Sequence, residues 1–184
     1  MCFIAKDAVT TPRGPIIPGE RPPGGNGSGI VTDHKPQDAK GTIKVDLNAV
    51  RTGVDRRDAQ MRSASFLDTE KGDVNRYAVF EIKHVELAGP LAPGKEVPAK
   101  IRGTFTVRGK PIETLADGTI TYIKLPPEQL ESQKRFGFTA DNLRVKTRLV
   151  TRFTNHGMQV PELLILKLSD DIQVETDLIL VKSQ

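Results

Sequence analysis

The side chains that could do chemistry are few and lie far apart along this chain. The three histidines, His34, His84 and His156, show no spacing that would place two of them on one helix face as metal ligands. The single cysteine, Cys2, has no activating motif beside it, and it excludes an internal disulfide. The two aspartates at 170–171 are typical of a turn. We therefore predict no catalytic residue, no metal site and no enzymatic activity.

Two other features are weak candidates for a binding site. The glycine-rich stretch 24–29 is not followed by the Gly-Lys-Ser/Thr of a phosphate loop. Arg144, Lys146 and Arg148 alternate along an expected strand and could meet anionic headgroups or an acidic partner, although an ordinary solvated strand face is the simpler interpretation. Aromatic residues make up only 5% of the chain, with no Trp, so we expect no nucleic-acid partner.

The elements that must position any site are mainly strands. With 184 residues, 13 Pro and 16 Gly, the chain suits one domain, 1–184, built from short strands and many turns. Ile43, Val45 and Leu47 alternate with Lys44 and Asp46, which is the period of a half-buried strand. Similar patterns predict about eight strands, mostly antiparallel, in a barrel or a sandwich. The expected strands cover residues 3–10, 43–48, 78–83, 101–108, 111–125, 135–141, 144–153, 161–169 and 172–182, the last two forming a hairpin about 170–171.

One short helix is expected near residues 55–63. Asp55 can accept backbone hydrogen bonds as its N-cap, and Asp58 and Arg62 have the favourable i, i+4 spacing. The polar stretch 129–134 is expected to be a loop. We expect the helix and its apolar neighbours to form a lid at one end of a barrel. The same neighbours could equally complete the core, and the two roles are compatible. These neighbours are Met61, Phe66 and Leu67.

The N-terminal part differs in composition. Pro and Gly interrupt residues 11–27, which predicts a long loop or arm that is either disordered or docks on a partner. Residues 1–6 show no charged leader, so the protein is either cytoplasmic or begins after a removed leader. In the second case Cys2 could be a lipid-modified first residue, whereas a small apolar residue at a fraying end is the simpler interpretation.

An ordered set of short motifs lies between Gly41 and Gly109. The set resembles the YceI family, lipocalin-like bacterial proteins associated with polyisoprenoid binding. The motifs are Gly41-Thr-Ile-Lys-Val-Asp-Leu47, Thr52-Gly53, Arg57-Asp58, Met61-Arg62-Ser63, Phe66-Leu67-Asp68, Glu70-Lys71, Ala78-Val79-Phe80 and Gly103-Thr-Phe-Thr-Val-Arg-Gly109.

This resemblance implies an all-β, lipocalin-like, eight-stranded antiparallel barrel whose elongated interior takes an isoprenoid chain. It also implies a periplasmic or otherwise exported protein. Many members have His where this chain has Gln60 and Arg108. Arg108 could donate to a quinone oxygen or a phosphate, or lie in solvent.

Two functions follow as expectations. The first is non-catalytic binding of an isoprenoid quinone or a polyprenyl lipid, as carrier or reservoir, with no other cofactor. The second is a structural or accessory subunit, with a self-filled barrel, of a larger assembly that is either membrane-bound or not. A membrane surface is a candidate partner, and the oligomeric state is left open. The expected lining residues are Ile43, Val45, Leu47, Met61, Phe66, Leu67, Phe80, Ile82, Ile101, Phe105, Val107, Ile120 and Phe138.

Overall fold

Strands make up most of the part of the chain that the computed structural model describes. It describes residues 2–12, 27–32, 39–160, 162–163, 166–167 and 169–182. The strands are β1 Cys2–Pro12, β2 Gly27–Thr32, β3 Lys40–Asp46, β4 Tyr77–Leu87, β5 Glu96–Val107, β6 Lys110–Lys124, β7 Asp141–Arg152, β8 Glu162–Leu163, β9 Leu166–Lys167 and β10 Asp171–Lys182. The helices are α1 Asp55–Arg62, α2 Asp73–Arg76 and α3 Pro127–Lys134, with single 3-10 turns η2 Leu47–Ala49, η3 Thr69–Lys71 and η4 Thr154–His156. No described helix is long and apolar enough to cross a bilayer.

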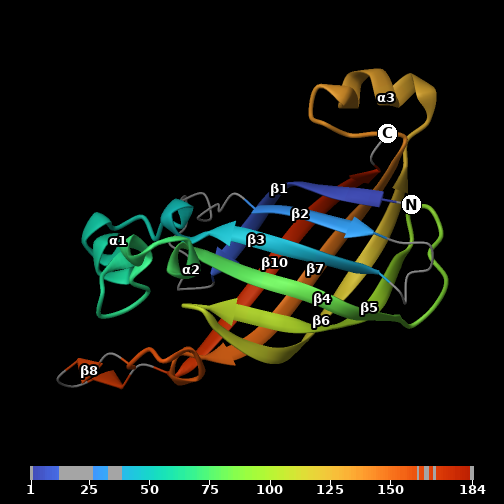
Figure 1. Cartoon of the computed structure of the whole chain (residues 1–184). Helices are drawn as coiled ribbons and strands as arrows, with labels where there is room; N and C mark the ends of the chain where they lie inside the picture. The colour runs from blue at the N-terminus through green and yellow to red at the C-terminus, as the bar shows by residue number, and fades with distance from the viewer. Residues whose placement is uncertain are drawn as a thin grey trace.

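The main sheet is antiparallel throughout. From β3 to β7 each long strand pairs with the next long strand in the chain, and β10 then pairs with β7. β1 and β2 pair with each other and join β10 to β3, so the strand order closes as β1-β10-β7-β6-β5-β4-β3-β2 (Figure 1). The all-β, antiparallel prediction is confirmed.

Alternation fixes which side of each strand faces inward. In β5 the apolar side chains of Val97, Ala99 and Ile101 are buried, whereas the side chains between them are exposed. Pairing then aligns the inward residues of neighbouring strands, because directly opposed residues lie on the same face of a sheet. Ile43 is opposite Phe80, and Phe80 is opposite Phe105. The core is therefore built from rungs of apolar side chains.

The expected hairpin about 170–171 is wrong. β10 begins at Asp171 but pairs with β7 and β1, not with the residues before it. The reason is cross-strand packing: Val174 is opposite Leu149 and Leu178 is opposite Val145, so the apolar face of β10 meets that of β7. The two-residue strands β8 and β9 pair only with each other.

The expected loop over 129–134 is also wrong, because these residues belong to α3. Pro127 occupies the first turn of the helix, where its missing N–H costs no hydrogen bond. No side chain of α3 is fully buried. The prediction of a single helix is also wrong, since α2 and α3 accompany α1.

The expected strand over 135–141 is a turn that leads into β7. Phe136 and Phe138 flank Gly137 and suggest a period of two, but Gly137 adopts a φ of 85°, which interrupts an extended strand. Extended pairing resumes only at Asp141. Phe138 consequently lies beside α3.

The helix α1 spans the predicted residues, but Asp55 is its first residue and not its N-cap. Val54 is the N-cap, and its side chain makes no capping hydrogen bond. Asp58 instead accepts from the backbone N–H of Thr52 at 2.7 Å and from the Thr52 hydroxyl, and it lies 4.0 Å from Arg62. Burial alone would raise the pKa of Asp58, but the two hydrogen bonds from Thr52 and the charge of Arg62 hold it below its ordinary value.

The Pro/Gly-rich arm predicted over 11–27 falls mostly outside the described residues. The structure describes its ends, where β1 continues to Pro12 and β2 begins at Gly27. Residues 13–26 lie outside the described ranges, so the arm stays a prediction.

Candidate functional site

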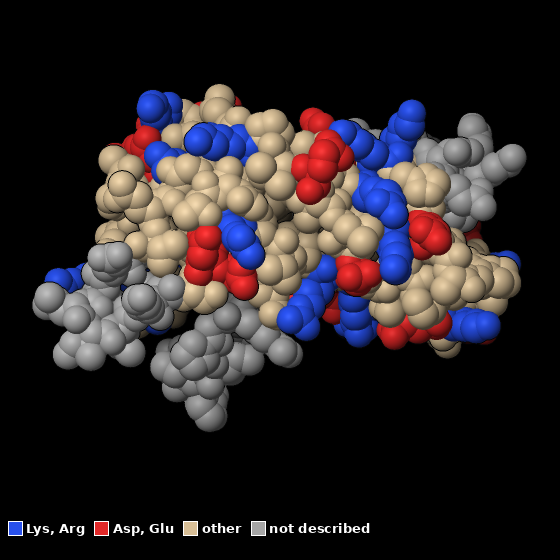
Figure 2. All heavy atoms as spheres, turned by 90° about the horizontal axis from the view of Figure 1, so that it is seen from below, with Lys and Arg blue, Asp and Glu red and all other residues tan. Residues whose placement is uncertain are grey.

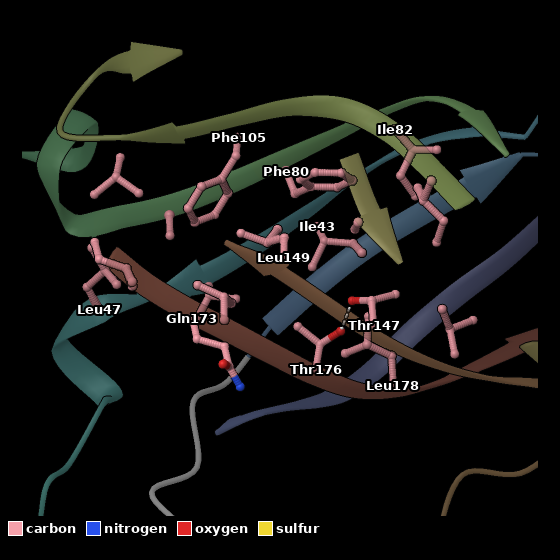
Figure 3. A pocket seen from close by; sticks show the side chains of 18 of the residues that line it. Ile43, Leu47, Phe80, Ile82, Phe105, Thr147, Leu149, Gln173, Thr176 and Leu178 are labelled. Atoms are coloured by element: carbon pink, nitrogen blue, oxygen red, sulfur yellow. Dashed lines mark hydrogen bonds between the residues drawn. The ribbon is translucent and has the colours of Figure 1, made fainter. Parts of the chain in front are cut away.

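A cavity of about 340 Å³ lies inside the barrel. Its wall comes from β3, β4, β5, β6, β7 and β10, together with residues of α1 and of the segments near Phe66 and Phe153. Figure 3 shows side chains from facing strands, among them Ile43, Phe80 and Leu149, pointing into the same space. This volume is at the small end of the range for sites that bind small molecules.

All of the predicted lining residues except Phe138 lie on the cavity wall. Phe138 is displaced by the turn at Gly137 and lines no part of it. That these residues bind a ligand stays a prediction. The residues on the wall are Ile43, Val45, Leu47, Met61, Phe66, Leu67, Phe80, Ile82, Ile101, Phe105, Val107 and Ile120.

Sequence reasoning missed the contribution of β7 and β10. Alternation along these strands was a usable signal, because the lining residues recur at every second position. Only the pairing of β10 with β7 shows that the two apolar faces form one wall. The missed apolar residues of these strands are Leu143, Val145, Leu149, Ile172, Val174, Leu178 and Leu180.

On the part of the cavity wall that the structure describes, the polar groups come from β7 and β10 alone. They are Thr147, Gln173 and Thr176, and none of the described lining residues carries a charge. Gln173 is already engaged, because its Oε1 accepts from Arg148 and its Nε2 donates to Glu175. The hydroxyls of Thr147 and Thr176 lie 2.6 Å apart and bond to each other (Figure 3).

Aromatic and apolar side chains line one end of the cavity. The rings of Phe66 and Phe153 lie 5.0 Å apart and tilted, and Met61 and Met158 also line the wall. Figure 1 places α1 and α2 together at one end of the barrel. The lid and the core interpretations are therefore compatible, since these residues both line the cavity and pack against the buried core.

His156 is a buried polar group next to this end. Its side chain is 0% exposed, and the Phe105 ring meets it edge-on with 5.7 Å between ring centroids. Its Nδ1 lies 3.2 Å from the carbonyl oxygen of Lys110, so Nδ1 must donate; Nε2 then accepts from the Thr151 hydroxyl at 2.9 Å. Burial lowers the pKa of His156, and the hydrogen bonds offset only part of that shift.

Burial of His156 gives the protein a pH-dependent stability. The unfolded chain takes up a proton at this residue near its usual pKa of about 6.5, whereas the native chain does so only at lower pH. The free energy of unfolding should therefore fall as the pH drops below about 6.5, and this contribution should level off below the native pKa. Urea unfolding at several pH values between about pH 8 and pH 5 measures the slope of the free energy of unfolding against pH.

The variant His156→Gln should flatten that slope. His84→Gln is the matched control, because His84 is exposed on β4. An identical slope for His156→Gln and the wild type would show that His156 does not carry the effect.

The outer surface of β7 is not a free basic stripe. Arg144 donates to both carboxylate oxygens of Asp177 at 2.6 and 2.8 Å, and Arg148 donates to Gln173. Figure 2 shows charges of both signs interspersed over the face seen from below.

Among the described residues there is also no group of three His, Cys, Asp or Glu side chains placed to hold a metal ion.

Comparison with protein-family models gives one decisive match, because the model of the YceI-like domain matches residues 24–180. The chain belongs to the YceI-like family. Comparison with curated protein sequences gave no significant match.

Several solved structures share the fold at low identity. The chain is similar to a Campylobacter jejuni YceI protein, with 16% identity, a TM-score of 0.65 and coverage of 94% of this chain and 92% of that chain. A polyisoprenoid-binding domain from Saccharophagus degradans is 17% identical, with a TM-score of 0.61 and coverage of 99% and 94%. BcnA from Burkholderia cenocepacia is 14% identical, with a TM-score of 0.60 and coverage of 97% and 95%. At these identities the likeness shows the fold alone.

The two departures from the YceI-like pattern lie away from the cavity wall. Gln60 is exposed on α1, and Arg108 donates to the backbone carbonyl of Gly157 at 3.0 Å. Arg108 and Gly109 form the turn between β5 and β6, both with positive φ. Arg108 therefore fastens this turn to the segment that follows His156.

Proposed function

We propose that this protein binds an apolar isoprenoid chain in the barrel cavity, without catalysis, as a carrier or reservoir. The observation that carries the proposal is the cavity itself, whose described wall is apolar apart from two threonines and one glutamine and carries no charge. Such a wall favours a ligand that is itself hydrocarbon over most of its length.

Burial of the ligand's hydrocarbon chain can supply the binding affinity. Each methylene removed from water contributes about 0.8 kcal/mol, so a chain of several isoprene units needs no strong polar anchor. The volume of about 340 Å³ accommodates a short segment. A longer chain would extend past the wall or require the barrel to widen.

Family membership supports the class of ligand. The Saccharophagus degradans neighbour is described as a polyisoprenoid-binding domain, and this chain shares its fold. We propose an isoprenoid quinone or a polyprenyl lipid as the ligand and a closed, lipocalin-like, eight-stranded barrel as the binding form. We further propose a periplasmic or exported location in a bacterium and exchange of the ligand at a membrane surface.

The accessory-subunit alternative requires a self-filled interior. A cavity of this volume supports the carrier over that alternative, because protein interiors are close-packed and retain few voids larger than a water molecule.

Organic extraction of the natively expressed, purified protein tests the proposal. Mass spectrometry of the extract should find an isoprenoid in a stoichiometric amount. No lipid in the extract, together with no uptake of an isoprenoid quinone by the purified protein, would contradict the proposal and favour the subunit.

A further inference from the structure

The cavity wall contains one pair of hydroxyl groups that the fold does not fully use. Thr147 on β7 is directly opposite Thr176 on β10, and their oxygens lie 2.6 Å apart. Two threonine hydroxyls offer two O–H donors, and their mutual bond engages only one of them. Among the described residues, no other side chain or backbone group bonds to either hydroxyl.

The neighbouring strand β6 presents no side chain beside the pair. Gly118 on β6 is directly opposite Thr147, and residues opposite each other lie on the same face of the sheet. A Cβ at Gly118 would lie only 2.1 Å from the carbonyl oxygen of Lys146, so the strands approach too closely there for a side chain. On the β6 side, therefore, no side chain lies next to the hydroxyl pair.

The rest of the wall defines what the pair can bind. The described residues on the opposite side of the cavity, on β3, β4 and β5, are all apolar. An anionic headgroup buried there would have no cation to compensate its charge. An uncharged oxygen needs only one donor, and the Thr147–Thr176 pair has one left.

From this geometry we infer that the Thr147–Thr176 pair anchors an uncharged oxygen acceptor on the ligand, such as a quinone or ketone carbonyl. A charged headgroup, such as the phosphate of a polyprenyl phosphate, stays outside the cavity. This inference rests on the proposed function, because it assigns the headgroup of the chain that the cavity holds.

Three probes with the same ten-carbon tail separate the contributions. Decylbenzoquinone carries carbonyl oxygens, decylbenzene carries none, and decyl phosphate is charged. Displacement of a neutral fluorescent naphthylamine from the purified, delipidated protein measures all three affinities. The wild type should bind the quinone more tightly than decylbenzene, and decyl phosphate most weakly.

The double variant Thr147→Val/Thr176→Val removes both hydroxyls and keeps the branched shape that suits a strand. It should bind decylbenzoquinone about tenfold more weakly and decylbenzene as tightly as the wild type does. Thr147→Ser/Thr176→Ser keeps both hydroxyls and should retain the affinity for the quinone. Thr119→Val is the matched control, because Thr119 is on β6 but not on the cavity wall.

The outcomes distinguish the two proposals. If the valine variant binds both neutral probes as the wild type does, the anchor is wrong and the apolar cavity stands. Preference of the wild type for decyl phosphate would also overturn the anchor. If neither neutral probe binds the wild type, the proposed function itself fails.

Discussion

Replacing Ala116 with Trp should abolish most of the affinity for apolar ligands. Ala116 is 2% exposed, lies on β6 and lines the cavity, so an indole at this position would occupy space that the ligand needs. If the indole keeps even two methylenes of the ligand out of the cavity, the binding free energy weakens by about 1.6 kcal/mol, which lowers the affinity about fifteenfold. Displacement of a fluorescent apolar probe by an isoprenoid quinone measures the effect.

The adjacent position supplies the control for this variant. Leu115 is on the outer face of the same strand and is 39% exposed, so Leu115→Trp adds the same indole outside the barrel. That variant should bind as the wild type does. Tight binding by Ala116→Trp would show that the ligand is held somewhere other than this cavity.

Replacing Phe105 with Ala should cause a large loss of stability. Phe105 is 7% exposed and packs against both Phe80, at 6.5 Å between ring centroids, and His156. Its removal forfeits the buried ring and enlarges an existing cavity, so the free energy of unfolding should fall by about 3–5 kcal/mol. Urea unfolding of the ligand-free protein measures this change.

Phe136→Ala tests whether the effect depends on burial. Phe136 is 61% exposed beside α3 and contacts only the Arg135 guanidinium among the aromatic and cation–π pairs of the described residues. Its replacement should cost less than about 1 kcal/mol. Equal losses for the two variants would mean that the barrel wall collapses around the missing Phe105 ring.

The inward faces of the strands were predictable because a period of two is a local property. The alternation within one strand is enough to assign a common face to Ile43, Val45 and Leu47, or to Ile101 and Phe105, and the partner strand need not be known. A slip of one residue would have turned the whole set outward. The cavity wall confirms their facing direction, although their contact with a ligand is untested.

Pairing between distant strands was not predictable from the same signal. The aspartates at 170–171 suit a turn, but nothing local reveals that β10 pairs with β7, whose residues lie at least 19 positions earlier. The hydroxyl pair has the same origin. Thr147 alternates with the basic residues of β7 and so should face inward, but its partner Thr176 is identified only by the register between the two strands.

Burial of His156 also depends on contacts that are distant in sequence. Asn155-His156-Gly157 resembles an exposed turn, and Gly157 indeed has a φ of 68°. The ring is covered because Phe105 and the carbonyl of Lys110, from the two strands on either side of the β5–β6 turn, pack against it. Local sequence predicts the turn and leaves its environment undetermined.

Closure of the barrel has a consequence for the order of assembly. β1 pairs with β10, as with Phe3 opposite Lys182, so the ladder that closes the barrel joins segments that are very distant in the sequence. Such non-local pairing is slow, and during synthesis it must wait until β10 has left the ribosome. Until then the sheet is open at both edges and lacks the wall residues Leu178 and Leu180. If the protein is the lipid carrier proposed above, it can retain its ligand only after this last step, so loading follows folding and cannot guide it.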